Sequence, residues 1–113
     1  MIIYKTPQEI AIMRESNRIV AKVLTELKAM ARPGVCTRDL DAHAEARARD
    51  LGAVPAFKGY RGYPASLCAS VNEEIIHGIP SERILRDGDI IGLDFFVLFE
   101  GFYGDAAVTV AVG

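Results

Sequence analysis

Two long apolar segments near the C-terminus, residues 90–99 and 102–112, set the fold of this chain. Both are rich in β-branched and aromatic residues, which favour strands. Only Glu100 and Gly101 separate them, and a connection of two residues is typical of a tight β-hairpin. We therefore predict that these segments pair as antiparallel strands.

Each predicted strand carries one aspartate, Asp94 or Asp105. With a two-residue loop, Asp94 faces Ala107 across the hairpin. Phe96 then faces Asp105, so the two aspartates are diagonal neighbours on the same face of the sheet. Such neighbours lie about 7–8 Å apart at Cα, which is close enough for two carboxylates to converge on one point. A single bulged residue would put them on opposite faces.

The expected neighbours of these carboxylates are apolar, namely Leu93, Phe95, Phe96 and Val108. Two carboxylates that converge in such surroundings repel each other and are poorly solvated, so either one is protonated or a cation lies between them. Oxygen ligands suit divalent metals, and a carboxylate pair can bridge two metals about 3.5–4 Å apart. In the alternative, both carboxylates point into solvent, or one of them caps a turn. The spacing alone leaves both interpretations open.

The N-terminal part of the chain predicts a long helix over residues 6–31. It begins with a capping box, Thr6-Pro7-Gln8-Glu9, and ends before Pro33-Gly34. Its apolar stripe is Ile10, Met13, Val20, Leu24 and Leu27.

A second helix is predicted over residues 37–51. Thr37 is the expected N-cap, and Gly52 suits the left-handed residue that ends a helix. The stripe of this helix is Leu40, Ala44, Ala48 and Leu51. His43 lies beside the stripe, and we expect it to be a surface or boundary residue without a ligand role, because it has no carboxylate or thiol partner at ligand spacing.

After the second helix the chain predicts short strands at residues 54–57, 67–71 and 74–77. Two helices followed by these strands and the hairpin make an α+β fold, in which the helices pack on a mainly antiparallel β-sheet. With 113 residues, half of them hydrophobic, the chain is expected to form a single domain over residues 1–113.

Charge and apolar patterning argue against several classes of function. The net charge is −2, with 13 basic and 15 acidic side chains mixed along the sequence, so we expect no nucleic acid partner. The apolar runs are too short to span a membrane, and MIIYKTPQE lacks the features of a signal peptide. We therefore expect a cytoplasmic protein, with Cys36 and Cys68 as free, partly buried thiols.

The segments GYRGYP and SVNEEIIHGIP, followed by the two aspartates of the hairpin, resemble type I methionine aminopeptidases. The resemblance covers all 113 residues, beginning at KTPQEIAIMRESNRIVAKVL and including RPGVCTRDLD. It implies half of a pita-bread fold and the chemistry of a metallopeptidase, which removes an N-terminal methionine from a peptide or a nascent protein. The cofactors that it implies are divalent metal ions: Co, Mn, Fe, Zn or Mg.

The resemblance also implies roles for individual residues. Asp94 and Asp105 are expected to be two ligands of a dinuclear metal site, and His77 is expected to stabilise the reacting peptide group. The expected walls of the methionine pocket are Phe57, Tyr60, Tyr63 and Cys68. A soft, apolar pocket suits a thioether side chain.

The chain departs from the family in length and at several polar positions. The family's catalytic domain has two similar halves, and its remaining ligands, a histidine and two glutamates, lie in the second half. Positions that are usually histidine or a hydroxyl residue hold Arg61, Phe96, Tyr103, Ala106 and Ala107 here. Because polar neighbours orient metal ligands, we expect the chain to be inactive, or nearly so, as a monomer.

Two further hypotheses stay open. Two copies could form an isologous homodimer whose axis brings together Asp94 and Asp105 of both chains, or a complementing C-terminal half could be the partner. The apolar final strand, AAVTVAVG, leaves an unprotected edge that fits a need for a partner. Alternatively, the chain is a non-catalytic module that binds peptides or proteins without a metal.

Overall fold

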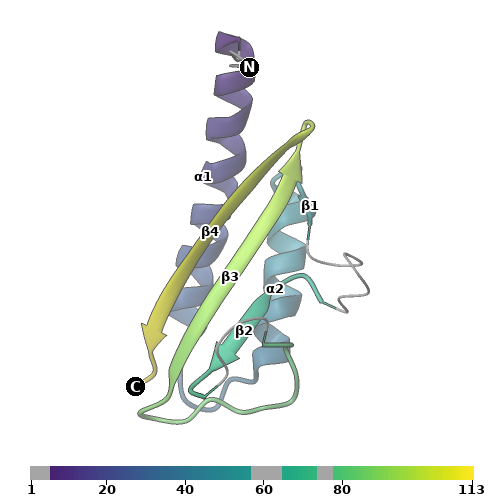
Figure 1. Cartoon of the computed structure of the whole chain (residues 1–113). Coiled ribbons are helices and arrows are strands. Elements are labelled where there is room, and N and C mark those ends of the chain that lie inside the picture. The colour runs from purple at the N-terminus through teal and green to yellow at the C-terminus, as the bar shows by residue number, and fades with distance from the viewer. Residues whose placement is uncertain (1–5, 57–64, 74–77) are drawn as a thin grey trace.

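The computed structural model describes residues 6–56, 65–73 and 78–113. Its elements are, in chain order, α1 (Pro7–Met30), α2 (Thr37–Asp50), β1 (Val54–Pro55), β2 (Cys68–Val71), β3 (Ile90–Phe99) and β4 (Phe102–Ala111). Both helices lie behind a single antiparallel sheet in the view of Figure 1. The described part of the chain therefore has the predicted α+β arrangement. None of its helices is long and apolar enough to cross a membrane.

β3 is the central strand of the sheet, and β4 pairs with it along its whole length on one side. The other side of β3 is shared by two shorter strands. β1 pairs near the hairpin, with Val54 opposite Leu98. β2 pairs farther from the hairpin, with Cys68 opposite Asp94. β4 therefore forms one complete edge of the sheet.

The short predicted strands are confirmed in part. Of the strand predicted at residues 54–57, the structure has Val54–Pro55, and residue 57 lies outside the described residues. Residues 67–71 form a strand over Cys68–Val71. The strand predicted at residues 74–77 lies outside the described residues.

The hairpin has the predicted two-residue connection. Glu100 and Gly101 both have positive φ angles, 47° and 85°, as a type I′ turn requires. The pairs nearest the turn and around the aspartates are Phe99 with Phe102, Phe96 with Asp105, and Asp94 with Ala107. The predicted register is therefore confirmed.

The hydrophobic core lies between the helices and the sheet. Its fully buried side chains on β3 are Ile91, Leu93, Phe95 and Val97. Because successive residues of a strand face opposite sides, Leu93 and Phe95 point away from Asp94, which lies between them. Val108 also packs on the core. The sequence predicted that Leu93, Phe95, Phe96 and Val108 surround the carboxylates. This prediction is wrong for Leu93, Phe95 and Val108, which face the core.

α1 begins with the predicted capping box, in which Thr6 Oγ1 accepts the N–H of Glu9 at 3.1 Å and Glu9 Oε1 accepts the N–H of Thr6 at 2.9 Å. The buried face of α1 runs from Ser16 to Leu27. Its first turns extend beyond the tip of the hairpin in Figure 1, and Ile10 there is 40% exposed. The predicted stripe is therefore correct only from Val20 onward.

α1 lies directly against β4 at Gly104. A Cβ atom at this position would lie 2.5 Å from the backbone oxygen of Ser16, so only glycine allows this approach. Two hydrogen bonds join the same elements. Ser16 Oγ donates to the carbonyl of Phe102 at 3.1 Å, and the N–H of Asp105 donates to Asn17 Oδ1 at 3.2 Å. α1 thereby fixes the backbone of β4 at one of the two aspartates.

The start of α2 differs from the prediction. Its N-cap is Cys36, and Thr37 is the first helical residue. The hydroxyl of Thr37 instead donates to the carbonyl of Ser81 at 3.2 Å and accepts the N–H of Ser81 at 2.8 Å. Gly52 ends the helix segment as expected, with a φ of 87°.

Candidate metal and substrate site

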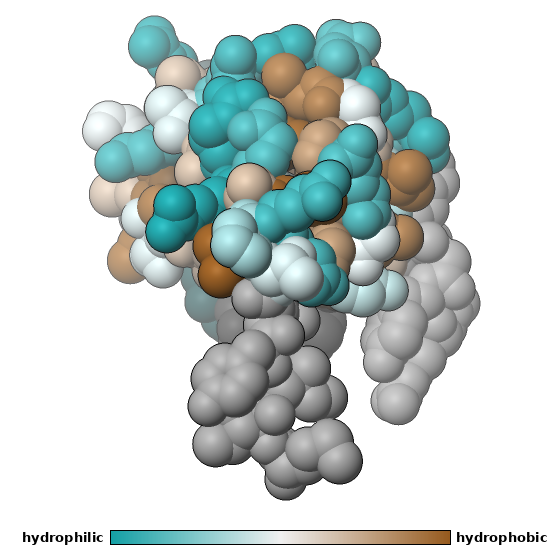
Figure 2. Space-filling model, turned by 90° about the horizontal axis from the view of Figure 1, so that it is seen from above, coloured by the Kyte–Doolittle hydropathy of each residue, from teal (hydrophilic) through white to brown (hydrophobic). Residues whose placement is uncertain are grey.

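The face of the sheet that points away from the helices carries the candidate site. Large apolar side chains are exposed on it, namely Val54, Ile90 and Tyr103. Figure 2, which looks down from the hairpin end, shows hydrophobic residues in separate groups among hydrophilic ones. Within the described residues, no helix or strand covers this outer face.

Asp94 and Asp105 both lie on the outer face, because each pairs across the hairpin with a residue of that face. Asp94 is half-buried in the middle of the sheet, between Cys68 on β2 and Ala107 on β4. Asp105 is exposed on the edge strand. The expected poor solvation is therefore wrong for Asp105, whose carboxylate is open to water.

An aromatic hollow adjoins Asp105. It has a volume of about 350 Å³ and is lined by Ala56, Phe96, Tyr103 and Asp105. The rings of Phe96 and Tyr103 meet edge to face, with centroids 6.3 Å apart and planes at 69°. Phe96 has no polar side-chain atom, so on this side Asp105 is flanked by rings rather than by the hydrogen-bonding side chains that commonly orient metal ligands.

Cys68 is the described residue of the predicted methionine pocket. It is 2% exposed, carries a free thiol, and lies directly opposite Asp94 in the register of β2 and β3. Cys36 is also free, as predicted, and both thiols are buried rather than partly buried. The other predicted site residues lie outside the described residues: Phe57, Tyr60, Tyr63 and His77.

The described residues do not form a complete metal centre by themselves. Among residues 6–56, 65–73 and 78–113, no group of three or more histidine, cysteine, aspartate or glutamate side chains is placed to hold a metal ion. Asp94 and Asp105 provide carboxylate oxygens, which suit a hard divalent cation, but two such residues are too few to fix its coordination geometry. The two carboxylates therefore fit a metal ion that is also bound by ligands other than the described residues.

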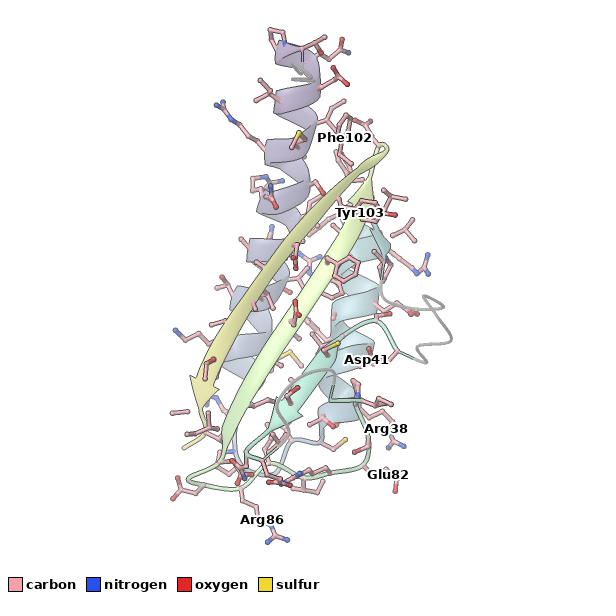
Figure 3. The ribbon with its side chains drawn as sticks, in the orientation of Figure 1. Arg38, Asp41, Glu82, Arg86, Phe102 and Tyr103 are labelled. Carbon is pink, nitrogen blue, oxygen red and sulfur yellow. The ribbon has the colours of Figure 1, made fainter. Side chains whose placement is uncertain are left out.

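Two acidic residues of α2 reach the turn that leads into β2. Asp41 Oδ1 accepts the N–H groups of Ser66 and Leu67 at 2.7 and 3.0 Å. Glu45 Oε1 accepts the hydroxyl of Ser66 at 2.9 Å. Figure 3 labels Asp41 on α2 beside this segment. We did not predict this contact from the sequence. The one signal for it was the spacing of four residues, which puts Asp41 and Glu45 on the same face of the helix.

A second ionic group joins the two helices away from the outer face. Glu26 Oε1 lies 2.7 Å from His43 Nε2 and 2.9 Å from Arg47 Nε. These contacts, with the Arg47 hydrogen bond as the largest cause, lower the pKa of Glu26 from its ordinary value. His43 is thus a boundary residue, as predicted, but it does have a carboxylate partner, which comes from the other helix.

Comparison with known proteins agrees with this geometry. The family model of metallopeptidase family M24 matches residues 11–113. Methionine aminopeptidase 1 of Bacillus subtilis is 52% identical over 113 residues, which are all of this chain and 46% of that protein. The crystal structure of methionine aminopeptidase from Thermotoga maritima superposes with a TM-score of 0.95 at 41% identity, and covers all of this chain and 46% of that one.

The chain belongs to metallopeptidase family M24, and its sheet presents two aspartates on an open face with two helices behind it. Within that family it is similar to methionine aminopeptidases and corresponds to their N-terminal half. The predicted half of a pita-bread fold is confirmed. The chain spans about half the length of the relatives it matches.

Proposed function

We propose that this chain supplies one half of a methionine aminopeptidase site. In this proposal Asp94 and Asp105 bind divalent metal ions together with ligands from another polypeptide segment. The assembled site would remove the N-terminal methionine from a peptide or a nascent protein. The observation that carries the proposal is the hairpin register, which puts both carboxylates on one open face, in a chain similar to methionine aminopeptidases along its whole length.

A bound pair of divalent ions, whether Co, Mn, Fe, Zn or Mg, would supply an activated water and polarise the scissile carbonyl. The residues of this chain would hold and orient the reactants. Asp94 is set between two strands and Asp105 is fixed through its backbone to α1, so both carboxylates stand on a rigid frame. His77 would stabilise the reacting peptide group. The methionine side chain would lie against Phe57, Tyr60, Tyr63 and Cys68.

We further propose that the lone chain is inactive, or nearly so, and works in the cytoplasm. Two carboxylates cannot fix a dinuclear centre, and the phenyl ring of Phe96 carries no N or O atom that could orient Asp105. The cytoplasmic location rests on the sequence, in which both cysteines are spaced as free thiols rather than as a disulfide framework.

The edge of β4 is where a partner strand would add. Backbone groups of an antiparallel strand alternate between its two sides, and the N–H of Asp105 points outward to Asn17. The backbone groups of Ala107, Thr109 and Ala111 therefore point outward too. α1 contacts this edge near the hairpin through Asn17, and we propose that a complementing half or a second copy pairs along Ala107–Ala111.

The position of this edge restricts how two copies could form a homodimer with a shared metal site. If two copies paired along Ala107–Ala111, the twofold axis would lie within that stretch. The two Asp105 residues would then be at least four positions apart along the strands, or about 13 Å at 3.3 Å per residue. An edge-to-edge dimer would not gather the carboxylates, so a four-carboxylate site requires the outer faces to meet instead.

The non-catalytic alternative is favoured by the exposed apolar side chains of the outer face, which could bind a peptide directly. It differs from the main proposal in needing no metal. For a pure binding module, partner affinity should be the same with EDTA as with Mn²⁺, and Asp94→Ala should leave it unchanged.

Calorimetric titration of Mn²⁺ and Co²⁺ into the metal-free chain tests the main proposal, with Asp94→Ala/Asp105→Ala as the matched variant. We expect weak binding that the double variant loses, because only two carboxylates are present. The molar mass should be recorded in the same buffer, since one metal pair per two chains would favour the homodimer. Equal heats for both proteins would show that these aspartates do not bind metal.

A further inference from the structure

Side chains of α2 hold the turn at residues 65–67. Both backbone donors, from Ser66 and Leu67, converge on one carboxylate oxygen of Asp41 at 2.7 and 3.0 Å. The hydroxyl of Ser66 reaches Glu45 at 2.9 Å. Ser66 and Leu67 are both fully buried. This short turn thus donates three hydrogen bonds to one helix face.

These bonds are hard to replace. Bonds from an N–H to a carboxylate are stronger than neutral ones, and a buried N–H that loses its acceptor costs the full penalty of its desolvation. Water has little access to Ser66 or Leu67 because neither side chain nor backbone of these residues is exposed. Removal of the Asp41 carboxylate therefore favours a shift of the turn itself.

A shift of the turn would be passed directly to the outer face. Cys68 follows Leu67 and is the first residue of β2, which has only four residues. Among the described strands β2 pairs with β3, and on its other side the N–H of Ala69 donates to the carbonyl of Gly78 at 2.8 Å. Its register puts Cys68 opposite Asp94 and on the same face. A slip by one residue would turn Cys68 to the core face and bring a neighbour beside the aspartate.

We propose that Asp41, assisted by Glu45, is a positioning residue of the candidate site. It fixes the turn at residues 65–67 and thereby places Cys68 beside Asp94. The importance of this placement for substrate binding rests on the proposed function, in which Cys68 borders the methionine side chain. The placement itself is independent of any metal or substrate.

The two buried thiols allow a direct test in the unmodified chain. Cys36 and Cys68 are both free and almost fully buried, but only Cys68 adjoins the turn. Alkylation with iodoacetamide, followed by mass spectrometry of the two cysteine peptides, gives a rate for each thiol in the same molecule. Cys36 serves as the internal reference, because global unfolding exposes both thiols together.

In Asp41→Ala we expect the alkylation rate of Cys68 to rise about tenfold or more relative to that of Cys36. Asp41→Asn should lie below Asp41→Ala, since its amide oxygen can still accept both N–H groups. Asp39→Ala removes the same charge from the same helix without a bond to the turn, and it should leave the ratio unchanged. If Asp41→Ala does not fold, Ser66→Ala, which loses only the bond to Glu45, should give a smaller selective rise.

A parallel rise at Cys36 and Cys68 would mean that Asp41 only stabilises the fold, and would overturn the proposal. An unchanged ratio in Asp41→Ala, or in Ser66→Ala where that variant is used, would overturn it too, as would equal ratios in Asp41→Asn and Asp41→Ala. Metal titration of the wild-type chain is read separately. An absence of metal binding in that titration would refute the proposed metal site, but it would not change the interpretation of the alkylation rates.

Discussion

Gly104 is a position on the frame of the site where one added carbon should be strongly disruptive. In Gly104→Ala the new Cβ would lie 2.5 Å from the backbone oxygen and 2.6 Å from Oγ of Ser16. Ordinary contact begins near 3.4 Å, so α1 and β4 must separate by nearly 1 Å. The backbone atoms involved cannot rotate away as a side chain can.

The expected loss of unfolding free energy is about 3 kcal/mol, which combines overpacking of about 1–3 kcal/mol with weakening of two hydrogen bonds between α1 and β4. With an m-value of about 2 kcal/mol/M, the midpoint of urea unfolding should fall by about 1.5 M. Circular dichroism at 222 nm gives this midpoint. The metal affinity should fall as well, because one of these bonds holds the N–H of Asp105.

Gly92→Ala is the matched control. Gly92 lies on β3, its φ is not in the left-handed region, and a Cβ there would meet its nearest atom at an ordinary 3.8 Å. The control should change stability by less than about 0.5 kcal/mol or stabilise slightly, since alanine suits a strand better than glycine. A Gly104→Ala midpoint within 0.25 M of the control would refute the reasoning.

Three other perturbations test the fold. Glu26→Gln should destabilise the fold at neutral pH by about 1 kcal/mol, because it weakens the bonds to His43 and Arg47. The pKa of Glu26 is lowered in the folded state, so the difference in melting temperature between wild type and variant should be complete above the ordinary glutamate pKa. It should vanish as the pH falls through the lowered pKa of the folded state. Glu100→Asn should raise the urea midpoint by about 0.5 M, since Glu100 has a φ of 47° and asparagine tolerates that region better; a lower midpoint would contradict the turn assignment. Phe95→Ala should cost about 3–5 kcal/mol, because Phe95 is fully buried, and calorimetry that finds less than 1 kcal/mol would show a looser core.

Local rules predicted the hairpin well and the surroundings of the aspartates poorly. The register follows from a two-residue turn, so Asp94 and Asp105 were placed on one face from spacing alone. Their neighbours were misjudged because adjacent residues in sequence, such as Leu93, point to the opposite face. Helical spacing likewise included Ile10 in the stripe, although the first turns of α1 extend beyond the tip of the hairpin and Ile10 is exposed.

Contacts between distant segments were beyond sequence reasoning. The bond from Asp41 to Ser66 spans 25 residues, and that from His43 to Glu26 joins two helices. Both depend on how α2 sits against its neighbours, which the periodicity of one helix does not specify. Gly104 carried a hint as a glycine within a strand, which often marks a close backbone approach, but its partner on α1 could not be named.

The central claim is that this chain carries half of a methionine aminopeptidase site. Its most direct test is hydrolysis of a peptide that begins with Met-Ala, by this chain mixed with the remaining part of methionine aminopeptidase 1 of Bacillus subtilis and Mn²⁺ or Co²⁺. We predict no turnover by either part alone, turnover by the mixture, and its loss with Asp94→Ala. A mixture that forms a one-to-one complex, binds metal and releases no methionine would contradict the account.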